Sequence, residues 1–380
     1  MVNTNFYKTV NSLMSFASGA GVPEVVDYAT FIEAGKTILQ MDGESVQNGF
    51  INPLMNKIGL SINVVRSYEG SYKELTRGTL EYGDTIEMIM NYFYDTQAAV
   101  FNNLVDGQSI DQYEINKPKA EVSYFVDSNS FDITRTIQRV ELEKAFSGPA
   151  AMDKFITGIT TYVVNSAEEA REVGRIALVG KLIIDLDASN AATSDNAPAT
   201  KYNLVTMYNA LTGAELTSDN CLYNEEFVKY AVAVIKKVMG KTEKASASYN
   251  LKGLKTFTPA SGRHLFVNSA LTSAMDTYIR TDNYNPEFSV LTDYINVPYW
   301  QDEDAPFVVK SKTGAEGETV TSSPVVAVFC DEYAIGEYLR TQAMEQSPYN
   351  ARGRYWNMFL HVEVKYVENT SANAVLFTLA

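Results

Sequence analysis

The chain has 380 residues, and its 31 lysines and arginines against 46 aspartates and glutamates give a formal net charge of −15. Hydrophobic residues make up 46% and charged residues 20%, a composition that excludes a wholly disordered chain and allows a sizeable buried core. At roughly 100–200 residues per domain, the length predicts two or three domains, or one core with long insertions. No run reaches the roughly 18 apolar residues of a membrane span, and residues 1–16 lack the build of a secretory signal.

The first elements in chain order are an arm and a hairpin. Residues 1–48 hold short apolar islands separated by glycine and proline, which indicates an arm that packs on another surface. Leu60, Ile62 and Val64 then alternate with polar residues, and a polar turn at 68–72 leads into a return arm at 79–84. This pattern predicts a hairpin that projects from the body of the protein.

Strands followed by helices are predicted next. Residues 122–126 and 133–137 read as strands, and residues 140–146 read as a short helix that ends before Pro149. Apolar residues at helical spacing predict a second helix over 152–163. Ser166 and Glu169 form a capping-box pattern, which predicts the start of a third helix of about 30 Å.

A polar linker at 187–200 is the clearest internal boundary. Beyond it, residues 227–238 predict a helix that stops at Gly240, and residues 265–267 predict a strand that leads into a helix through Ile279. We expect a loop at 310–318 and strands at 325–329, 356–366 and 374–379. Because the elements show neither regular βα alternation nor an internal repeat, the predicted fold class is α+β.

Side chains suited to acid–base or metal chemistry are scarce. The two histidines, His264 and His361, lie in strand-like runs, and Cys221 and Cys330 lack any metal-binding or redox spacing. We expect both histidines to be structural and both cysteines to be reduced. The sequence predicts no catalytic residue, no cofactor and no metal site.

Asp185 and Asp187 are among the carboxylate groupings that come nearest to a catalytic or cation-binding pattern. On an extended strand they would share one face and could clamp a cation. As a helix end that runs into a loop they would be solvated, which is the interpretation that we favour. The acidic triplet at 302–304 is likewise interpreted as a solvated loop.

Three blocks of the sequence stand out together. They are residues 349–362 with Asn373, Ala374 and Val375, residues 52–59 followed by 78–87, and residues 140–146 with Phe155, Ile156 and Ile159. In this order they resemble tailed-phage major capsid proteins of the small podophage, salasmavirus-like branch. The resemblance covers roughly residues 50–180 and 260–380, and it implies an HK97-like major capsid fold. It divides the chain into an N-terminal arm (1–50), an extended loop hairpin (51–94), a peripheral domain with a spine helix (95–199), an axial domain (200–325) and return strands of the peripheral domain (326–380).

The resemblance implies a structural subunit that assembles into hexamers and pentamers and forms an icosahedral or prolate head around double-stranded DNA. Scaffold and portal proteins would be its partners, and no membrane would take part. The subunit would belong to the virion after assembly in the bacterial host cytoplasm. Some relatives add an immunoglobulin-like domain after the last strand, whereas this sequence stops at Ala380, so we expect no external decoration.

The net charge predicts how the subunit interacts with DNA, and two alternatives to the capsid function stay open. A subunit with a net charge of −15 would repel DNA phosphates, so we expect no tight or sequence-specific DNA site. An encapsulin-like nanocompartment shell protein stays open as an alternative. An acidic hydrolase that uses Asp185 and Asp187 is a third interpretation.

A shell subunit works through its contacts. The 24 tyrosines and 18 phenylalanines supply side chains that interfaces favour. We expect the hairpin to contact neighbouring subunits and a tryptophan near the carboxyl end to anchor such a contact, with ordinary core packing as the alternative for each aromatic residue. The predicted intersubunit contacts are Tyr68, Tyr72, Lys73, Arg77, Tyr82 and Trp356.

Overall fold

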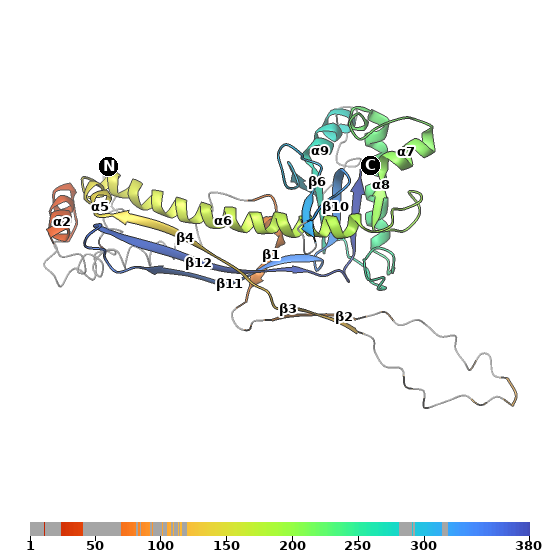
Figure 1. Ribbon diagram of the computed structural model, residues 1–380, viewed down its shortest axis with the longest axis horizontal. Helices are drawn as coiled ribbons and strands as arrows, with labels where there is room; N and C mark the ends of the chain where they lie inside the picture. The colour runs from red at the N-terminus through yellow and green to blue at the C-terminus, as the bar shows by residue number, and fades with distance from the viewer. Residues whose placement is uncertain are drawn as a thin grey trace. The chain divides into compact units, whose positions relative to one another are not determined.

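The computed structural model describes residues 11, 24–40, 70–80, 83, 85–91, 93, 101, 105–107, 109, 113, 115, 120–280, 291, 293–313 and 318–380. The chain divides into two compact units, and each is assembled from three separate stretches of sequence. The first unit comprises residues 1–81, 128–173 and 338–365, and the second comprises residues 82–127, 174–337 and 366–380. Figure 1 shows their helices and strands.

The first unit contains most of a four-stranded sheet. The strand order is β1 (Thr76–Thr79), β11 (Ile335–Gln346), β12 (Tyr355–Glu368) and β4 (Asn129–Gln138) (Figure 1). Strand β12 runs antiparallel to β4, from Tyr355 opposite Gln138 to Val364 opposite Asn129. Because alternate side chains of a strand share one face, β12 buries one regular series, which is Trp356, Met358, Leu360, Val362 and Val364.

Two short helices of the first unit pack through aromatic side chains. Helix α2 (Tyr28–Gln40) places the ring of Phe31 6.0 Å from the ring of Phe146. Phe146 follows helix α5 (Arg139–Ala145), which confirms the short helix predicted there. Gly35 permits this close approach, since a Cβ atom at that position would lie 2.7 Å from the Phe146 ring.

The long helix α6 (Pro149–Asp187) is continuous over 39 residues, about 58 Å at 1.5 Å per residue. It begins with a proline at its first position, where the missing N–H costs no intrahelical hydrogen bond. The predicted helix boundary at Ser166 is wrong, because Ser166 and Glu169 lie in the middle of α6. The capping-box pattern misled the prediction, since no proline interrupts the helical spacing on either side of it.

Two glycines of α6 differ in the space around them, so alanine substitutions at the two positions should change the stability in opposite directions. A Cβ atom added at Gly174 would lie 2.0 Å from the hydroxyl oxygen of Tyr366, whereas one added at Gly158 would meet nothing within 4 Å. Gly158→Ala should stabilise the subunit by about 0.5–1 kcal/mol, because alanine favours the helix. Gly174→Ala should destabilise it by about 1–2 kcal/mol, because overpacking outweighs that gain. Urea unfolding of the unassembled subunit measures both, and equal shifts would contradict the packing argument.

The second unit contains a five-stranded mixed sheet with a fully buried centre. Its strand order is β5 (Lys201–Asn203), β13 (Ala374–Thr378), β10 (Val325–Asp331), β6 (Arg263–Asn268) and β7 (Ile295–Val297). Strand β10 lies antiparallel to both β13 and β6, and every residue of β10 is buried. This burial agrees with the continuous apolar run from Val325 to Cys330, which lacks the alternation of a half-exposed strand.

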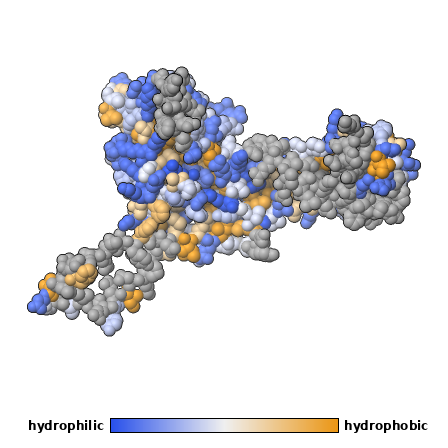
Figure 2. Space-filling view, turned by 180° about the vertical axis from the view of Figure 1, so that it is seen from behind, coloured by the Kyte–Doolittle hydropathy of each residue, from blue (hydrophilic) through white to orange (hydrophobic). Residues whose placement is uncertain are grey.

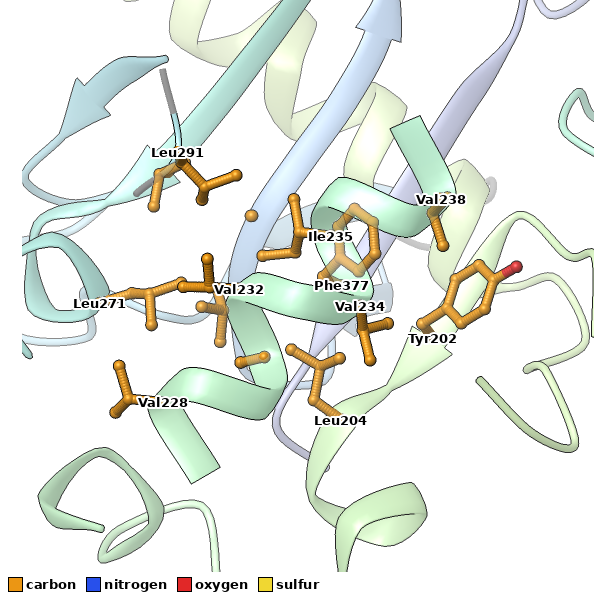
Figure 3. Packing of buried hydrophobic residues seen from close by; sticks show 14 of the residues in the cluster. Tyr202, Leu204, Val228, Val232, Val234, Ile235, Val238, Leu271, Leu291 and Phe377 are labelled. Carbon is orange, nitrogen blue, oxygen red and sulfur yellow. The ribbon is translucent and has the colours of Figure 1, made fainter. Parts of the chain in front are cut away.

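Three helices that line the core of the second unit begin in the same way. Helices α7 (Leu204–Thr212), α8 (Glu225–Thr242) and α9 (Ser269–Met275) each follow an asparagine whose side chain accepts a hydrogen bond from a backbone N–H of the first turn. Those asparagines are Asn203, Asn224 and Asn268. Figure 3 shows the apolar side chains of α8 meeting residues from the strands and neighbouring helices of the core.

Several other elements of the second unit differ from the predictions in their bounds or their type. Helix α8 ends at Thr242, two residues beyond the predicted stop at Gly240. The predicted loop at 310–318 is wrong, because β8 (Lys310–Thr313) and β9 (Glu318–Thr321) pair as a hairpin. The strands predicted at 265–267, 325–329, 356–366 and 374–379 are confirmed within longer or slightly shifted bounds.

Candidate assembly surfaces

An antiparallel ribbon in the second unit carries apolar side chains on both faces. It consists of β2 (Ile86–Asn91) and β3 (Ala120–Phe125). On one face Ile89 lies opposite Val122, and these side chains are 56% and 40% exposed. A two-stranded ribbon is at best marginally stable in water. Burial of this face against a further surface would therefore be favourable.

Polar and aromatic contacts hold the ribbon to the rest of the second unit. The Nζ atom of Lys252 lies 3.1 Å from Glu121, and the ring of Phe93 lies 5.8 Å from that of Phe257. Across the ribbon, the Tyr124 hydroxyl donates a hydrogen bond of 3.1 Å to a carboxylate oxygen of Glu87, which raises the pKa of Tyr124. These contacts leave Ile89, Val122 and Tyr124 exposed in the single chain.

The predicted hairpin tip packs into the first unit over its described part. Tyr72 is 1% exposed, and its N–H donates a 3.2 Å hydrogen bond to the carboxylate of Glu172. Burial, together with the nearby Glu172 charge, raises the pKa of Tyr72. Beyond Leu75, strand β1 joins the sheet beside β11. The predicted projection is therefore wrong for residues 70–80, because the polar turn is built into the body, while the other predicted arm at 60–64 lies outside the described residues.

The predicted contact residues fall into three groups. Lys73 is exposed and Arg77 is half-buried, so both reach the surface of the first unit. Tyr72 and Trp356 are buried within the single chain, which favours the core-packing alternative for both. Tyr68 and Tyr82 lie outside the described residues. The intersubunit role of all six residues stays a prediction.

The apolar face of the ribbon was absent from the predicted contacts. The alternation of Val122 and Tyr124 predicts a strand, but its partner β2 lies before residues 92–119 in the sequence. Pattern alone does not reveal such a distant pairing. Figure 2 shows that orange apolar residues also remain on the surface among blue hydrophilic ones, as expected of a chain with several exposed large apolar side chains.

The carboxylates and histidine that the sequence singled out make structural contacts. Asp187 ends α6, where it lies 2.8 Å from the Nζ atom of Lys201 and accepts a 3.1 Å hydrogen bond from the Ser323 N–H. Asp185 lies two positions earlier on the same helix, so the pair does not share a strand face. His361 Nδ1 lies 2.6 Å from Asp132, directly across the β12–β4 pair.

Reactive groups within the described residues are few. Both cysteines are buried thiols, and burial raises the pKa of Cys221 to about 11. In the described part of the chain no group of three or more histidine, cysteine, aspartate or glutamate side chains could hold a metal ion. Of the helices in the same residues, none is long and apolar enough to span a bilayer.

Known proteins are similar to this chain over nearly its whole length. The family model for the Phi29-like phage major capsid protein matches residues 10–378. The major capsid proteins of Bacillus phages B103 and PZA are each 24% identical to it, over 98% of this chain and 73% of their own length. One solved structure, the capsid structure of Staphylococcus phage Andhra, contains a chain that is similar to this one. The match covers 83% of this chain and 86% of the Andhra chain, with a TM-score of 0.55 and 10% sequence identity. The predicted resemblance and the α+β, HK97-like fold class are confirmed.

Proposed function

We propose that this chain, which belongs to the Phi29-like phage major capsid protein family, works as a shell subunit whose exposed ribbon is covered by neighbouring copies. Its function is structural, as a capsid-forming component of a phage virion. The observation that carries the contact proposal is the exposed apolar face formed by Ile89, Val122 and Tyr124 on a ribbon of only two strands. Such a face is best stabilised by another protein surface.

The assembly proposal extends to rings and partners. Copies join into hexamers and pentamers, which form an icosahedral or prolate head around double-stranded DNA, with scaffold and portal proteins as partners and without a catalytic step. Assembly takes place in the bacterial host cytoplasm. The net charge of −15 supports a lining that does not grip the genome, because phosphate groups and acidic side chains repel each other.

The domain proposal keeps the N-terminal arm (1–50), the peripheral domain (95–199), the axial domain (200–325) and the return strands (326–380), but revises the extended loop. Residues 70–80 pack within the first unit, whereas the β2–β3 ribbon offers apolar side chains on its surface. We therefore assign the extended-loop role to the ribbon in place of residues 70–80, which takes β2 from the predicted loop (51–94) and β3 from the predicted peripheral domain (95–199). Lys73 and Arg77 keep their proposed intersubunit role at the surface of the first unit.

The experiment replaces two apolar side chains on the exposed face of the ribbon with serine. The wild-type chain, expressed with a scaffold protein, should form hollow shells in electron micrographs. Ile89→Ser with Val122→Ser should reduce the yield of shells about tenfold or more, because two apolar side chains lose the burial that assembly gives them. The urea midpoint of the unassembled subunit should stay unchanged, because both side chains are exposed there.

A matched control replaces Leu211 and Val320 with serine, which removes two other exposed apolar side chains of the second unit. This control should assemble like the wild type. Full assembly of the ribbon variant would overturn the ribbon contact alone. A wild-type chain that stays monomeric with every assembly helper present would overturn the shell function. Particles that hold cargo protein instead of DNA would favour an encapsulin-like role.

A further inference from the structure

One end of the five-stranded sheet in the second unit holds a buried group of four polar side chains. Strand β10 ends there at Asp331, while its two neighbours, β13 and β6, begin there. Asn373 directly precedes β13, and Thr258 lies shortly before β6. We call this group the polar cluster; its members and their exposed fractions are Thr258 (0%), Asn373 (1%), Asn250 (5%) and Asp331 (7%).

The hydroxyl group of Thr258 lies between a carboxylate and a side-chain amide. It donates a 2.6 Å hydrogen bond to Oδ2 of Asp331, and it accepts a 3.1 Å hydrogen bond from Nδ2 of Asn373. The hydroxyl proton therefore points at a carboxylate, while the oxygen itself faces the amide. A hydroxyl group within hydrogen-bond reach of a base is the arrangement of an activated nucleophile.

Further hydrogen bonds fix the carboxylate and the amide. The Tyr333 N–H donates a 2.9 Å hydrogen bond to Oδ1 of Asp331, so each oxygen of this carboxylate accepts one. Nδ2 of Asn250 donates a 3.4 Å hydrogen bond to Oδ1 of Asn373. This distance exceeds that of a formed oxyanion hole, but such contacts shorten when negative charge develops on the acceptor. Asn250 can therefore stabilise a charged oxygen on Asn373.

The backbone holds the reacting side chains at one place. The Asp331 N–H donates a 2.8 Å hydrogen bond to the carbonyl oxygen of Asn373, and the Thr258 N–H donates a 2.9 Å hydrogen bond to the carbonyl oxygen of Thr242. Groups that are held together in this way react as if they were present at a very high concentration. Since the cluster is buried, little water competes with the Thr258 hydroxyl for the amide.

We propose that Thr258 and Asn373 join in an ester bond, with Asp331 as the general base. Oγ1 of Thr258 attacks Cγ of Asn373 while the hydroxyl proton passes to Asp331. The bond between Cγ and Nδ2 then breaks with its electron pair on nitrogen, which takes the proton from Asp331 and leaves as ammonia. No oxidant, reductant or further reactant is needed. Ammonia becomes ammonium in neutral water and diffuses away, which drives the reaction forward.

This cross-link goes beyond the proposed shell function. It forms once in each chain, so it modifies a structural protein and involves no turnover. The two residues are 115 positions apart, and the loop that they close contains β6 and β10. A cross-link that closes a long loop restricts the unfolded chain. The linked chain should therefore migrate faster than an unlinked one in denaturing gel electrophoresis.

Mass spectrometry of the full chain tests the bond, both in assembled shells and in unassembled subunits. The wild type should be lighter than its sequence by one molecule of ammonia. Trypsin cleaves after Lys255, Arg263 and Lys365. After unfolding and digestion, peptide 256–263 should therefore stay joined to the peptide that begins at Tyr366. Hydroxylamine should separate the two peptides, because it cleaves esters under conditions that leave amides intact.

Variants of the cluster assign the roles. Thr258→Val removes the nucleophile and Asp331→Asn removes the base, and each keeps nearly the shape of the original side chain. Both should have the full mass of their sequences, whereas Thr258→Ser keeps a hydroxyl group and should form the bond. The matched control is Thr242→Val, because Thr242 is also 0% exposed but its hydroxyl donates a 2.7 Å hydrogen bond to the backbone carbonyl of Met239. This control should stay linked.

The outcomes are distinct. A linked wild type with unlinked Thr258→Val and Asp331→Asn supports the ester. A wild type of full mass in both samples would show that the cluster is an ordinary hydrogen-bonded network, and the proposal would be overturned. A loss of ammonia confined to the peptide that begins at Tyr366 would show that Asn373 cyclises to a succinimide, which also overturns it. Shells that form without the bond leave the shell function standing.

Discussion

Replacing Arg175 with methionine should destabilise the unassembled subunit by about 3–5 kcal/mol, because it leaves the carboxylate of Glu337 buried without its cation. Arg175 lies on α6 and Glu337 on β11, and their side chains are 1% and 0% exposed. The Nε atom of Arg175 lies 2.5 Å from the Glu337 carboxylate. Urea unfolding followed by circular dichroism measures the loss.

The double replacement Arg175→Met with Glu337→Met is the matched control. It removes both charges and keeps apolar volume in the site, so it should recover most of the stability that the single change loses. An Arg171→Met variant removes a more exposed ion pair with Glu168, and its cost should stay at or below about 1 kcal/mol. Equal losses for Arg175→Met and Arg171→Met would show that burial does not set the strength of the pair.

The sequence predicts those elements whose own side chains repeat with a clear period. Helix α8 places Phe227, Ile235 and Val238 in the core, as its helical spacing predicts. Strand β12 alternates buried and half-buried residues over most of its length, and its period of two is visible in the sequence. The long β11 was missed, because its residues alternate poorly and its burial pattern is irregular.

Predictions at boundaries and turns failed where a local motif had two meanings. Ser166 and Glu169 match a capping box, but the same residues are compatible with the surface of a continuous helix. The polar turn around Gly70 indicates a projecting tip. Because Gly70 has no side chain, however, the carboxylate of Glu172 occupies the space that a Cβ atom would fill. In both cases tertiary packing, which single-sequence patterns do not contain, decides the outcome.

Contacts between distant parts of the sequence account for the rest of the candidate sites. Arg175 and Glu337 are 162 positions apart, and neither belongs to a motif. A largely apolar pocket of the second unit combines segments around residues 219, 274 and 306 with Leu379. The acidic character of 302–304 was visible in the sequence, but its position beside an apolar pocket was not. Charge composition alone therefore predicts a solvated loop and does not reveal the adjoining pocket.

Trp356 tests whether a predicted contact residue acts within the subunit or between subunits. Its side chain is 0% exposed, and its ring lies 4.7 Å from that of Tyr349. Across the sheet it lies opposite Ile137, which is also 0% exposed. On the other face of the same strand, Phe359 is only half-buried. The two aromatic residues therefore share a strand but differ in burial.

Trp356→Ala should destabilise the unassembled subunit by about 3–5 kcal/mol, because it removes a large side chain from a closed core and leaves a cavity. Trp356→Phe should lose less, since the ring that remains fills most of that volume. Phe359→Ala should cost about 1 kcal/mol, because much of its side chain is already in contact with water. Urea unfolding measures all three. If Trp356→Ala unfolds at the wild-type midpoint and loses only the ability to assemble, Trp356 is an intersubunit anchor and the core-packing interpretation is wrong.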